Sequence, residues 1–294
     1  MSSSQAIIAF QDYDLGSTLA SGQAFRWTFR DGAWEGVIGT HWVRLSQKPH
    51  GIEAERAQPV PEWQWLTHYL QTDVNLAEVL RAFPQDEPLG RSVQECRGLR
   101  LLRQDPWECL ASFILSSTKQ IVQIQQIVGE LCTRFGEPVP VPPGHKPFYT
   151  FPTAERLAKV TEAELRACKM GFRAPSLLKT SQMITAGEVD LQRLFSLNVD
   201  QAHNELLRFR GVGNKIANCV LLFAYGFQQA FPVDVWVMKA LKDLYFPQRR
   251  PSAKRLARFT STYFGPYAGY AQQYLFHYMR MKGRLPASSV SSSS

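Results

Sequence analysis

Lys215 is the residue whose type and surroundings offer the clearest chemistry. It lies two positions after Gly211-Val212-Gly213, a glycine turn that joins two stretches of helical sequence. Glycines permit positive φ and a close approach by another backbone, and outward-facing amides at the start of the next helix suit a phosphate. Cys219 follows Lys215 by four positions, and cysteine is usually buried, so this helix face should point inward. Partial burial beside positive helix ends would favour the neutral amine, which is the nucleophilic form.

Asp234 is the second candidate, nineteen residues after Lys215 within Phe231-Pro-Val-Asp-Val-Trp. Its position predicts an N-cap for a helix over 235–244. Its carboxylate would also suit a sugar cation that develops while a carbon–nitrogen bond breaks, and the cap would fix the carboxylate for that role. From these residues alone, an ordinary helix–helix turn, a solvated lysine and a purely structural cap stay open as alternatives.

The first third of the chain has the pattern of short strands. Apolar and polar residues alternate over 25–29, 34–39 and 41–45, and turn residues lie at 30–33 and 39–40. Residues 61–83 then place apolar side chains at helical spacing. We expect residues 1–95 to form a small antiparallel sheet domain with accompanying helices.

Residues 96–285 are predicted to form an α-helical body, which makes the fold class α+β. Asp105-Pro-Trp-Glu is a helix start, and helical spacing continues to Phe135. The proline-rich segment 137–150 predicts a loop, and Thr161 begins a capping box. The hairpin that carries Lys215 would span about 202–226, and the serine-rich tail 286–294 is predicted to be disordered. Further helices are expected over 192–209, 214–225, 235–244, 252–263 and 266–281.

Composition excludes several classes of protein. The chain has 294 residues, of which 45% are apolar and 20% charged, values typical of a globular protein rather than a disordered or fibrous one. The sequence contains no run of eighteen apolar residues, so it predicts no membrane span. The N-terminus lacks the features of a secretion signal, so we expect an intracellular protein. Five cysteines spread singly argue against a disulfide framework, a zinc site or an iron–sulfur cluster.

Charge is distributed unevenly along the chain. Residues 1–95 carry 7 Lys and Arg against 12 Asp and Glu, whereas residues 96–294 carry 26 against 13. The net charges are therefore −5 and +13. This asymmetry is typical of a polyanion partner for the helical body, with a solvated basic surface as the alternative.

Four segments in order carry a resemblance to a known family. They are Ser21-Gly-Gln-Ala-Phe-Arg-Trp27, Leu102-Arg-Gln-Asp-Pro-Trp-Glu-Cys109, the Lys215 hairpin with Pro232-Val-Asp234, and Gly265-Pro-Tyr-Ala-Gly-Tyr-Ala-Gln272. The hairpin and aspartate resemble the helix-hairpin-helix and Gly/Pro/Asp motif of base-excision DNA glycosylases. Taken together, the segments resemble the 8-oxoguanine DNA glycosylase/AP lyase family over about residues 15–280.

The resemblance implies a reaction and a set of site residues. Lys215 would attack C1′ of the damaged nucleotide and form a Schiff base that permits β-elimination, while Asp234 would stabilise the transition state. Glycosylases extrude the target base into a pocket, and the matching pocket residues are Gly22, Cys219, Gln272 and Phe276. Phe172 would fill the gap left by the extruded base, and Arg173 would contact the orphaned cytosine. Gly211, Val212 and Gly213 would bind phosphate.

The chain also departs from the family's pattern around the orphaned cytosine. Thr118, Lys119 and Gln120 replace three asparagines, and Gln123 replaces an arginine. A strict preference for cytosine therefore does not follow from the resemblance. Trp236 stands in place of a histidine.

The leading hypothesis is a bifunctional glycosylase and lyase that acts, as a monomer, on double-stranded DNA containing oxidised guanine. No cofactor and no metal are expected, because the lysine supplies the nucleophile. One alternative is a monofunctional alkylbase glycosylase of the same fold, which would lack the lysine. The other is a non-catalytic helix-hairpin-helix DNA-binding protein, which would leave the pairing of Lys215 with Asp234 unexplained.

Overall fold

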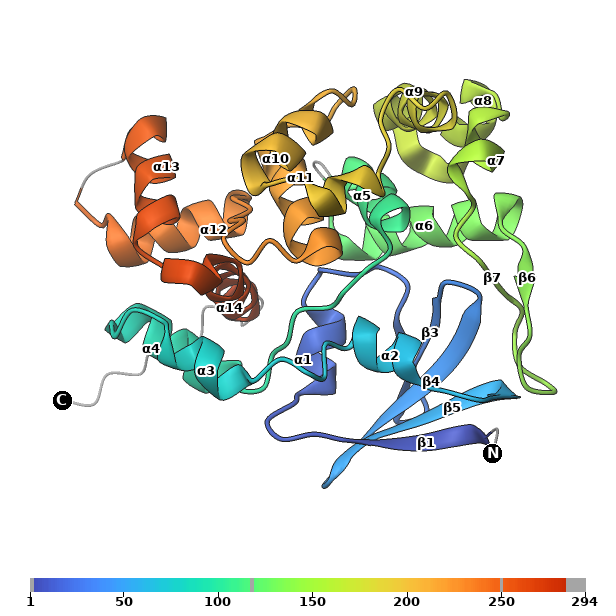
Figure 1. The fold of residues 1–294 in the computed structure, drawn as a ribbon, viewed down its shortest axis with the longest axis horizontal. Helices are drawn as coiled ribbons and strands as arrows, with labels where there is room; N and C mark the ends of the chain where they lie inside the picture. The colour runs from blue at the N-terminus through green and yellow to red at the C-terminus, as the bar shows by residue number, and fades with distance from the viewer. Residues whose placement is uncertain (1–2, 117–118, 249–250, 284–294) are drawn as a thin grey trace.

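A five-stranded antiparallel sheet forms the N-terminal part of the fold (Figure 1). The computed structural model describes residues 3–116, 119–248 and 251–283. The strand order is β1-β5-β4-β3-β2, and hairpins connect neighbours from β2 to β5. Their bounds are β1 (Ser3–Ala9), β2 (Thr28–Arg30), β3 (Ala33–Ile38), β4 (His41–Lys48) and β5 (Gly51–Val60).

The predicted strand over 25–29 is only partly correct, because β2 starts at Thr28. Phe25 belongs to the larger helical core instead, and the Trp27 indole donates to the Tyr69 hydroxyl at 2.9 Å. The predicted strands over 34–39 and 41–45 are confirmed by β3 and β4, which pair with Gly36 opposite Val43. Two helices, α1 (Leu15–Ala20) and α2 (Gln64–Tyr69), contribute to the apolar core on one face of the sheet.

In the rest of the described chain the regular structure is mostly helical, as predicted. The helix expected over 192–209 is divided, because a 3-10 turn at Arg193–Ser196 ends before a helix that Asn198 caps. A second difference concerns the helical spacing up to Phe135, which is interrupted between α5 (Pro106–Leu115) and α6 (Ile121–Phe135). The Ser116 N–H and hydroxyl both donate to the Phe113 carbonyl and end α5, while a capping box of Gln120 and Gln123 starts α6. The helices are α3 (Leu76–Arg81), α4 (Glu87–Glu95), α5 (Pro106–Leu115), α6 (Ile121–Phe135), α7 (Ala154–Ala158), α8 (Glu162–Leu165), α9 (Ala174–Thr185), α10 (Val199–Leu207), α11 (Asn214–Val220), α12 (Val235–Ala240), α13 (Ala253–Thr262) and α14 (Ala268–Lys282).

The segment 137–150, predicted as a loop, contains a two-stranded hairpin of β6 (Pro138–Val139) and β7 (Phe148–Tyr149). Val139 and Phe148 pack against Val37 and Trp42 of the large sheet. This apolar contact gives the hairpin a partner that the local sequence does not reveal. The hairpin therefore connects the helical body to the sheet.

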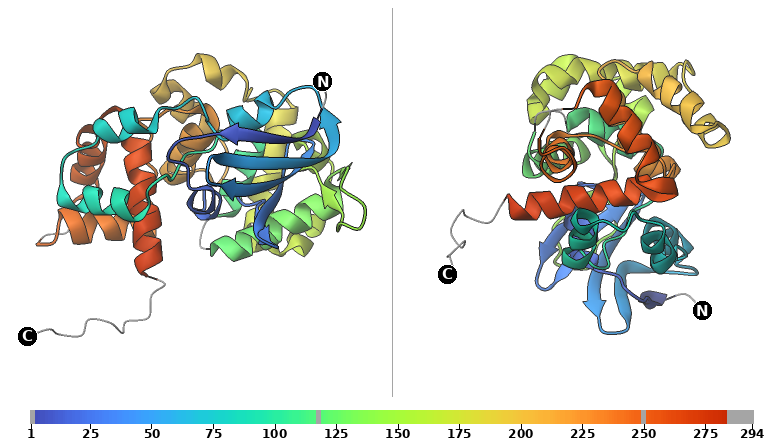
Figure 2. Two further views of the ribbon diagram at one scale, coloured as in Figure 1. Left: turned by 90° about the horizontal axis from the view of Figure 1, so that it is seen from below. Right: turned by 90° about the vertical axis from the view of Figure 1, so that its left-hand side faces the viewer.

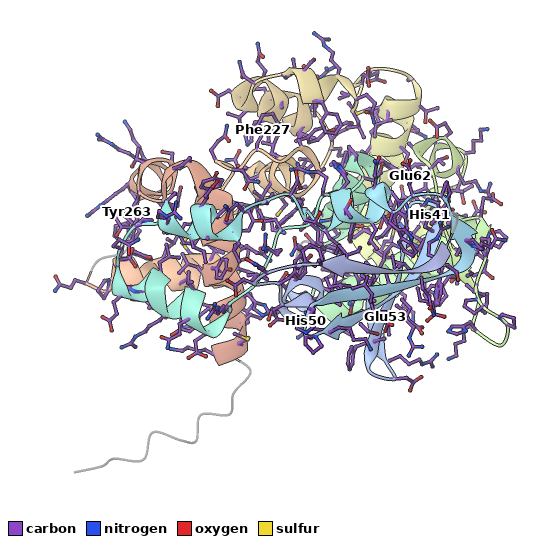
Figure 3. The ribbon with its side chains drawn as sticks, turned by 60° about the horizontal axis from the view of Figure 1, so that its bottom comes forward. His41, His50, Glu53, Glu62, Phe227 and Tyr263 are labelled. Atoms are coloured by element: carbon purple, nitrogen blue, oxygen red, sulfur yellow. The ribbon has the colours of Figure 1, made fainter. Side chains whose placement is uncertain are left out.

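Helix α14 runs through the helical body as one long element (Figure 2). Its Tyr270 and Tyr274 side chains are fully buried, and the helix packs against α12 and α4. The hydroxyl of Tyr263, which follows α13, donates a hydrogen bond to Asp86 at the start of α4. On the sheet side, His50 and Glu53 lie at the β4–β5 hairpin (Figure 3). Helices α3 and α4 thus belong to the larger core, although they precede residue 96.

Several expectations concern residues outside the described ranges. The tail 286–294 and Thr118 are among them. Within the described ranges, no helix has the length and apolar composition that a membrane crossing requires. All five cysteines are buried and unpaired.

Candidate active site

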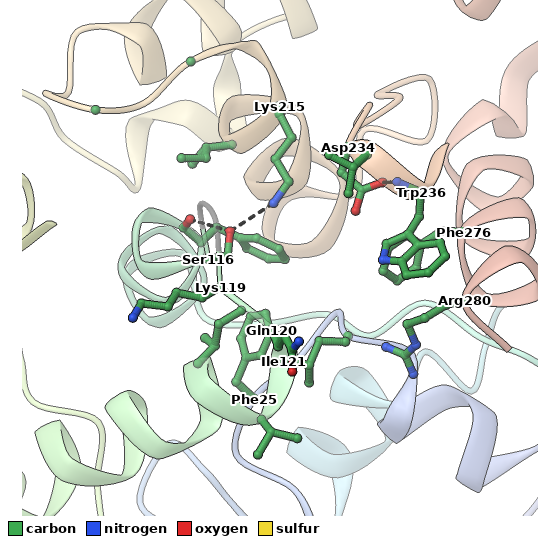
Figure 4. A pocket seen from close by; sticks show the side chains of 18 residues that line it. Phe25, Ser116, Lys119, Gln120, Ile121, Lys215, Asp234, Trp236, Phe276 and Arg280 are labelled. Carbon is green, nitrogen blue, oxygen red and sulfur yellow. Dashed lines mark hydrogen bonds between the residues drawn. The ribbon is translucent and has the colours of Figure 1, made fainter. Parts of the chain in front are cut away.

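A cavity of about 960 Å³ lies where the two parts of the fold meet (Figure 4). Its wall comes from the segment after α1, the α5–α6 junction, the glycine turn, the start of α12 and one face of α14. Among the predicted site residues, it brings together Gly22, Gly211, Gly213, Lys215, Asp234 and Phe276. The other described residues that line it are Phe25, Phe113, Ser116, Lys119, Gln120, Ile121, Val122, Ile124, Ile216, Val235, Trp236 and Arg280.

The glycine turn differs in detail from the prediction. Gly211 has φ of +82°, which favours glycine, but Gly213 is extended with φ of −108° and is the N-cap of α11. The Val212 N–H donates to the Phe209 carbonyl at 3.1 Å, so it is used inside the turn rather than for a phosphate. A Cβ added at Gly213 would meet no atom of another segment within 4 Å. This open space lets another backbone approach the start of α11.

Lys215 points from α11 into the cavity (Figure 4). Its Nζ donates to the Ser116 hydroxyl at 3.0 Å and lies 5.0 Å from the centre of the Phe113 ring. Ser116 in turn donates to the Phe113 carbonyl at 2.7 Å. Ser116 and Phe113 both lie at the end of α5, and Ser116 precedes Lys215 by 99 residues. A sequence pattern around the lysine therefore could not identify them.

Asp234 caps α12, as predicted. Its Oδ1 accepts from the Trp236 N–H at 3.0 Å and the Val237 N–H at 2.8 Å, while the second oxygen is directed into the cavity (Figure 4). Burial raises the pKa of the Asp234 carboxyl, and the backbone donors and the Lys215 charge act in the opposite direction. The helix cap therefore holds a half-desolvated carboxylate in the same cavity as the lysine.

Cys219 and Gln272 lie behind the cavity wall rather than on it. Cys219 is 3% exposed, and burial raises the pKa of its thiol to about 11, against the opposing effect of Lys215. Its burial confirms that this face of α11 points inward. Gln272 is also buried, and its Oε1 accepts no hydrogen bond within the described residues. Phe276, one turn later on α14, reaches the cavity itself.

Gly22 has φ of +80°, and an added Cβ would lie 2.5 Å from Ile121 Cδ1. Any side chain at this position would therefore enter the cavity wall. The glycine keeps this end of the cavity open between the segment after α1 and the start of α6.

Phe172 and Arg173 belong to a short 3-10 turn over Gly171–Arg173 and do not line the cavity. Phe172 is 68% exposed, which suits a wedge and excludes the alternative of a core residue. Arg173 is 3% exposed, and its guanidinium lies 4.2 Å from the centre of the Phe172 ring. A contact between Arg173 and an orphaned cytosine stays a prediction that requires this side chain to move outward.

Comparisons with known proteins follow the two parts of the fold. Residues 7–110 match the N-terminal domain of 8-oxoguanine DNA glycosylase, and residues 111–266 match the HhH-GPD superfamily of base excision DNA repair proteins. The N-glycosylase/DNA lyase OGG1 of Arabidopsis thaliana is 34% identical over 278 residues, which cover 88% of this chain and 75% of that protein. A probable N-glycosylase/DNA lyase of Methanothermobacter thermautotrophicus is 33% identical over 69% of this chain and 70% of its own length.

Solved structures agree with these matches. The Clostridium acetobutylicum 8-oxoguanine glycosylase/lyase, in complex with double-stranded DNA containing cytosine opposite 8-oxoguanine, has a TM-score of 0.88 and 32% identity, covering 95% of this chain and 98% of that one. A 3-methyladenine DNA glycosylase from Archaeoglobus fulgidus, at 22% identity and a TM-score of 0.77, shares the fold. The chain therefore belongs to the HhH-GPD superfamily of base excision DNA repair proteins and carries the N-terminal domain of the 8-oxoguanine DNA glycosylases.

Proposed function

We propose that this protein is a bifunctional DNA glycosylase/AP lyase that removes 8-oxoguanine from duplex DNA. The observation that carries the proposal is the amine of Lys215, held by Ser116 in the same cavity as the partly buried carboxylate of Asp234. The relatives named N-glycosylase/DNA lyase and the 8-oxoguanine glycosylase/lyase structure support the same reaction. A monofunctional alkylbase glycosylase does not require this lysine, so its presence favours the bifunctional enzyme.

In the proposed reaction, the damaged base leaves the stack and enters the cavity. As the C1′–N9 bond breaks, its electron pair goes to the base, and the sugar gains positive charge that the Asp234 carboxylate stabilises. The Lys215 nitrogen forms a bond to C1′ and loses a proton. The C1′–O4′ bond then breaks, O4′ takes up a proton, and C1′ and the Lys215 nitrogen form a protonated Schiff base. In the β-elimination a base removes a proton from C2′, a C2′=C3′ double bond forms, and the C3′–O3′ bond breaks with its electron pair leaving on the 3′ phosphate.

The remaining site residues divide the work of recognition. Phe276 offers a ring face for stacking, and Gly22 leaves space and backbone polar groups at the end of the cavity. Gln272 and Cys219 would support this base site from behind the wall. Gly211 and Gly213 expose backbone at the start of α11, where a DNA phosphate fits. Phe172 would enter the duplex.

The opposite strand would meet fewer specific contacts than the family's pattern provides, because residues of that pattern are replaced in this chain. Gln123, which stands in place of an arginine, accepts a hydrogen bond from the Gln120 N–H at 3.0 Å within the cap of α6. This use of Gln123 supports a relaxed preference for cytosine opposite the lesion. We also propose that the enzyme works as a monomer on DNA inside the cell, in a nucleus or a nucleoid.

Strand cleavage with and without hot alkali tests the proposal. On a duplex with one 8-oxoguanine, the wild type should cut without alkali, while Lys215→Gln should bind the duplex and neither release the base nor cut. Lys48→Gln is the control, because Lys48 is a half-exposed cation of β4, paired with Glu53, and does not line this cavity; Lys119, which points away from Lys215 in Figure 4, is left unchanged because it lines the cavity. Cleavage by Lys215→Gln at the wild-type rate would refute the assignment.

A further inference from the structure

One face of α14 carries three residues at intervals of four, and the last two of them line the cavity. Two of them, Gln272 and Phe276, were predicted from the sequence, and the third is Arg280. Arg280 lines the cavity although it is 6% exposed, and its guanidinium lies below Phe276 and beside Ile121 (Figure 4). A buried cation therefore stands next to the surface on which a base would stack.

Contacts with Phe276 and with α1 hold this guanidinium in position. Its carbon lies 5.7 Å from the centre of the Phe276 ring, and one of its nitrogens donates to the carbonyl of Ala20, the last residue of α1. The other terminal nitrogen lies 3.1 Å from the point where a Cβ on Gly22 would stand. The charge is thus held between Phe276 and Gly22, both of which line the cavity.

Arginine brings a particular chemistry to that place. It stays protonated at all physiological pH values and offers only donors, so it pairs with carbonyl oxygens and repels amino groups. Among the described residues that line the cavity, Lys119, Lys215 and Arg280 are basic and Asp234 alone is acidic. The base end of the cavity therefore has a positive potential, which favours an electron-rich edge of a base.

We propose that Arg280 is a specificity-determining residue that selects purines with a carbonyl oxygen on their pocket-facing edge and stabilises the base as it leaves. This inference rests on the proposed function. When the C1′–N9 bond breaks, the electron pair spreads from N9 onto the carbonyl oxygens of the purine. The fixed guanidinium stabilises that negative charge until the base takes up the proton that Lys215 loses on forming its bond to C1′.

A purely structural role predicts a different outcome, because Arg280 also ties α14 to the end of α1. If the contact with Ala20 were its only purpose, loss of Arg280 would disturb every step of the reaction equally. If Arg280 acts on the base, steps that involve no base should survive. Cleavage of a duplex that already contains an abasic site separates the two roles.

The experiment compares Arg280→Met, Arg280→Lys and the wild type in single-turnover assays. The duplexes contain 8-oxoguanine, 8-oxohypoxanthine, 8-oxoadenine, hypoxanthine or an abasic site. 8-Oxohypoxanthine has a C6 carbonyl and an N1–H where 8-oxoadenine has an amino group and an unprotonated N1. It has a C8 carbonyl and an N7–H that hypoxanthine lacks. Lys282→Met is the matched control, because Lys282 is an exposed cation near the end of the same helix.

We expect Arg280→Met to lower the rate on 8-oxoguanine by about 100-fold, as loss of one electrostatic stabiliser does in other enzymes. The rate of cleavage at the abasic site should change less than about threefold. The preference for 8-oxohypoxanthine over 8-oxoadenine, its preference over hypoxanthine, or both, should become smaller. Arg280→Lys should retain part of both effects.

The proposal would be overturned if both Arg280 variants lost the same fraction of the rate on 8-oxoguanine and on the abasic site. It would also be overturned if the preferences for 8-oxohypoxanthine over 8-oxoadenine and over hypoxanthine both stayed unchanged. Inactivity of the wild type on every duplex would instead refute the proposed function. The assay therefore distinguishes failure of the inference from failure of the function on which it rests.

Discussion

Replacement of Asp234 by Asn separates the two roles that the structure gives this residue. Both capping hydrogen bonds end on Oδ1, and asparagine has a carbonyl oxygen that can take the same position. Asparagine caps helices about as well as aspartate does, so α12 should keep its start. The charge of the second oxygen, which faces the cavity, is lost.

The expected effect on the reaction is large. Removing one preorganised electrostatic group costs about 2.7–4 kcal/mol of transition-state stabilisation, or about 10²–10³-fold in rate. Coulomb's law gives a similar size, because two unit charges at about 4 Å attract by about 4 kcal/mol at an effective dielectric constant of about 20. We therefore expect Asp234→Asn to release 8-oxoguanine at least about 100-fold more slowly in single-turnover assays.

Thermal unfolding provides the control. Asp234→Asn should unfold within about 0.5 kcal/mol of the wild type, whereas Asp234→Ala should lose about 1 kcal/mol because the cap is gone. Both variants should show the same slow base release. Base release by folded Asp234→Asn within threefold of the wild-type rate would refute the catalytic role of the carboxylate.

The pH dependence gives a second test of the same residue. Burial raises the pKa of Asp234 above that of an ordinary aspartate. Base release should therefore fall as the pH drops through this raised pKa, and Asp234→Asn should lack that acidic limb. The free energy of unfolding depends on pH in the opposite direction. The contribution of Asp234 to it is complete below the pKa that Asp234 has in the unfolded chain, and is lost as the pH rises through its higher pKa in the folded protein.

Three further substitutions test the geometry of the site. Ser116→Ala removes the hydroxyl that accepts a hydrogen bond from the Lys215 amine. The activation free energy of Schiff-base formation should rise by about 1 kcal/mol, which slows this step about fivefold, and the affinity for duplex should not change. An unchanged rate would mean that Ser116 does not orient the lysine. Gly22→Ala forces a side chain into a backbone with φ of +80°, against Ile121, so excision of 8-oxoguanine should fall far more than cleavage at an abasic site; parallel losses would contradict a base-binding role. Phe172→Ala removes a side chain that is 68% exposed, so the free energy of unfolding should change by less than about 0.5 kcal/mol while affinity for lesion duplex falls about tenfold or more; unchanged affinity in a binding titration would exclude the wedge.

Local sequence patterns predicted the parts of the site that depend on neighbouring residues. Lys215 follows a glycine turn and Asp234 begins a helix, and both features are encoded within a few positions. The cap on α12 and the inward face of α11 are therefore present as predicted. The positive φ of Gly211 also follows from residue type, whereas Gly213 has its extended conformation because it caps α11.

The features that the sequence did not reveal depend on contacts between distant segments. Ser116 becomes relevant only because the break between α5 and α6 places it against Lys215. Arg280 is of a residue type that usually lies on the surface, but its side chain is buried where α14 contacts the end of α1. Val139 of the β6–β7 hairpin gains its partner from the large sheet. None of these contacts has a signature in spacing or residue type.

Trapping with sodium borohydride tests the central claim most directly, because reduction captures a Schiff base as a stable covalent bond. Duplexes with 8-oxoguanine opposite each of the four bases should all give a covalent protein–DNA adduct with the wild type and with Lys48→Gln, and none with Lys215→Gln. A peptide map should place the modification on Lys215. Release of 8-oxoguanine by the wild type without any adduct, or an adduct that persists in Lys215→Gln, would contradict the account.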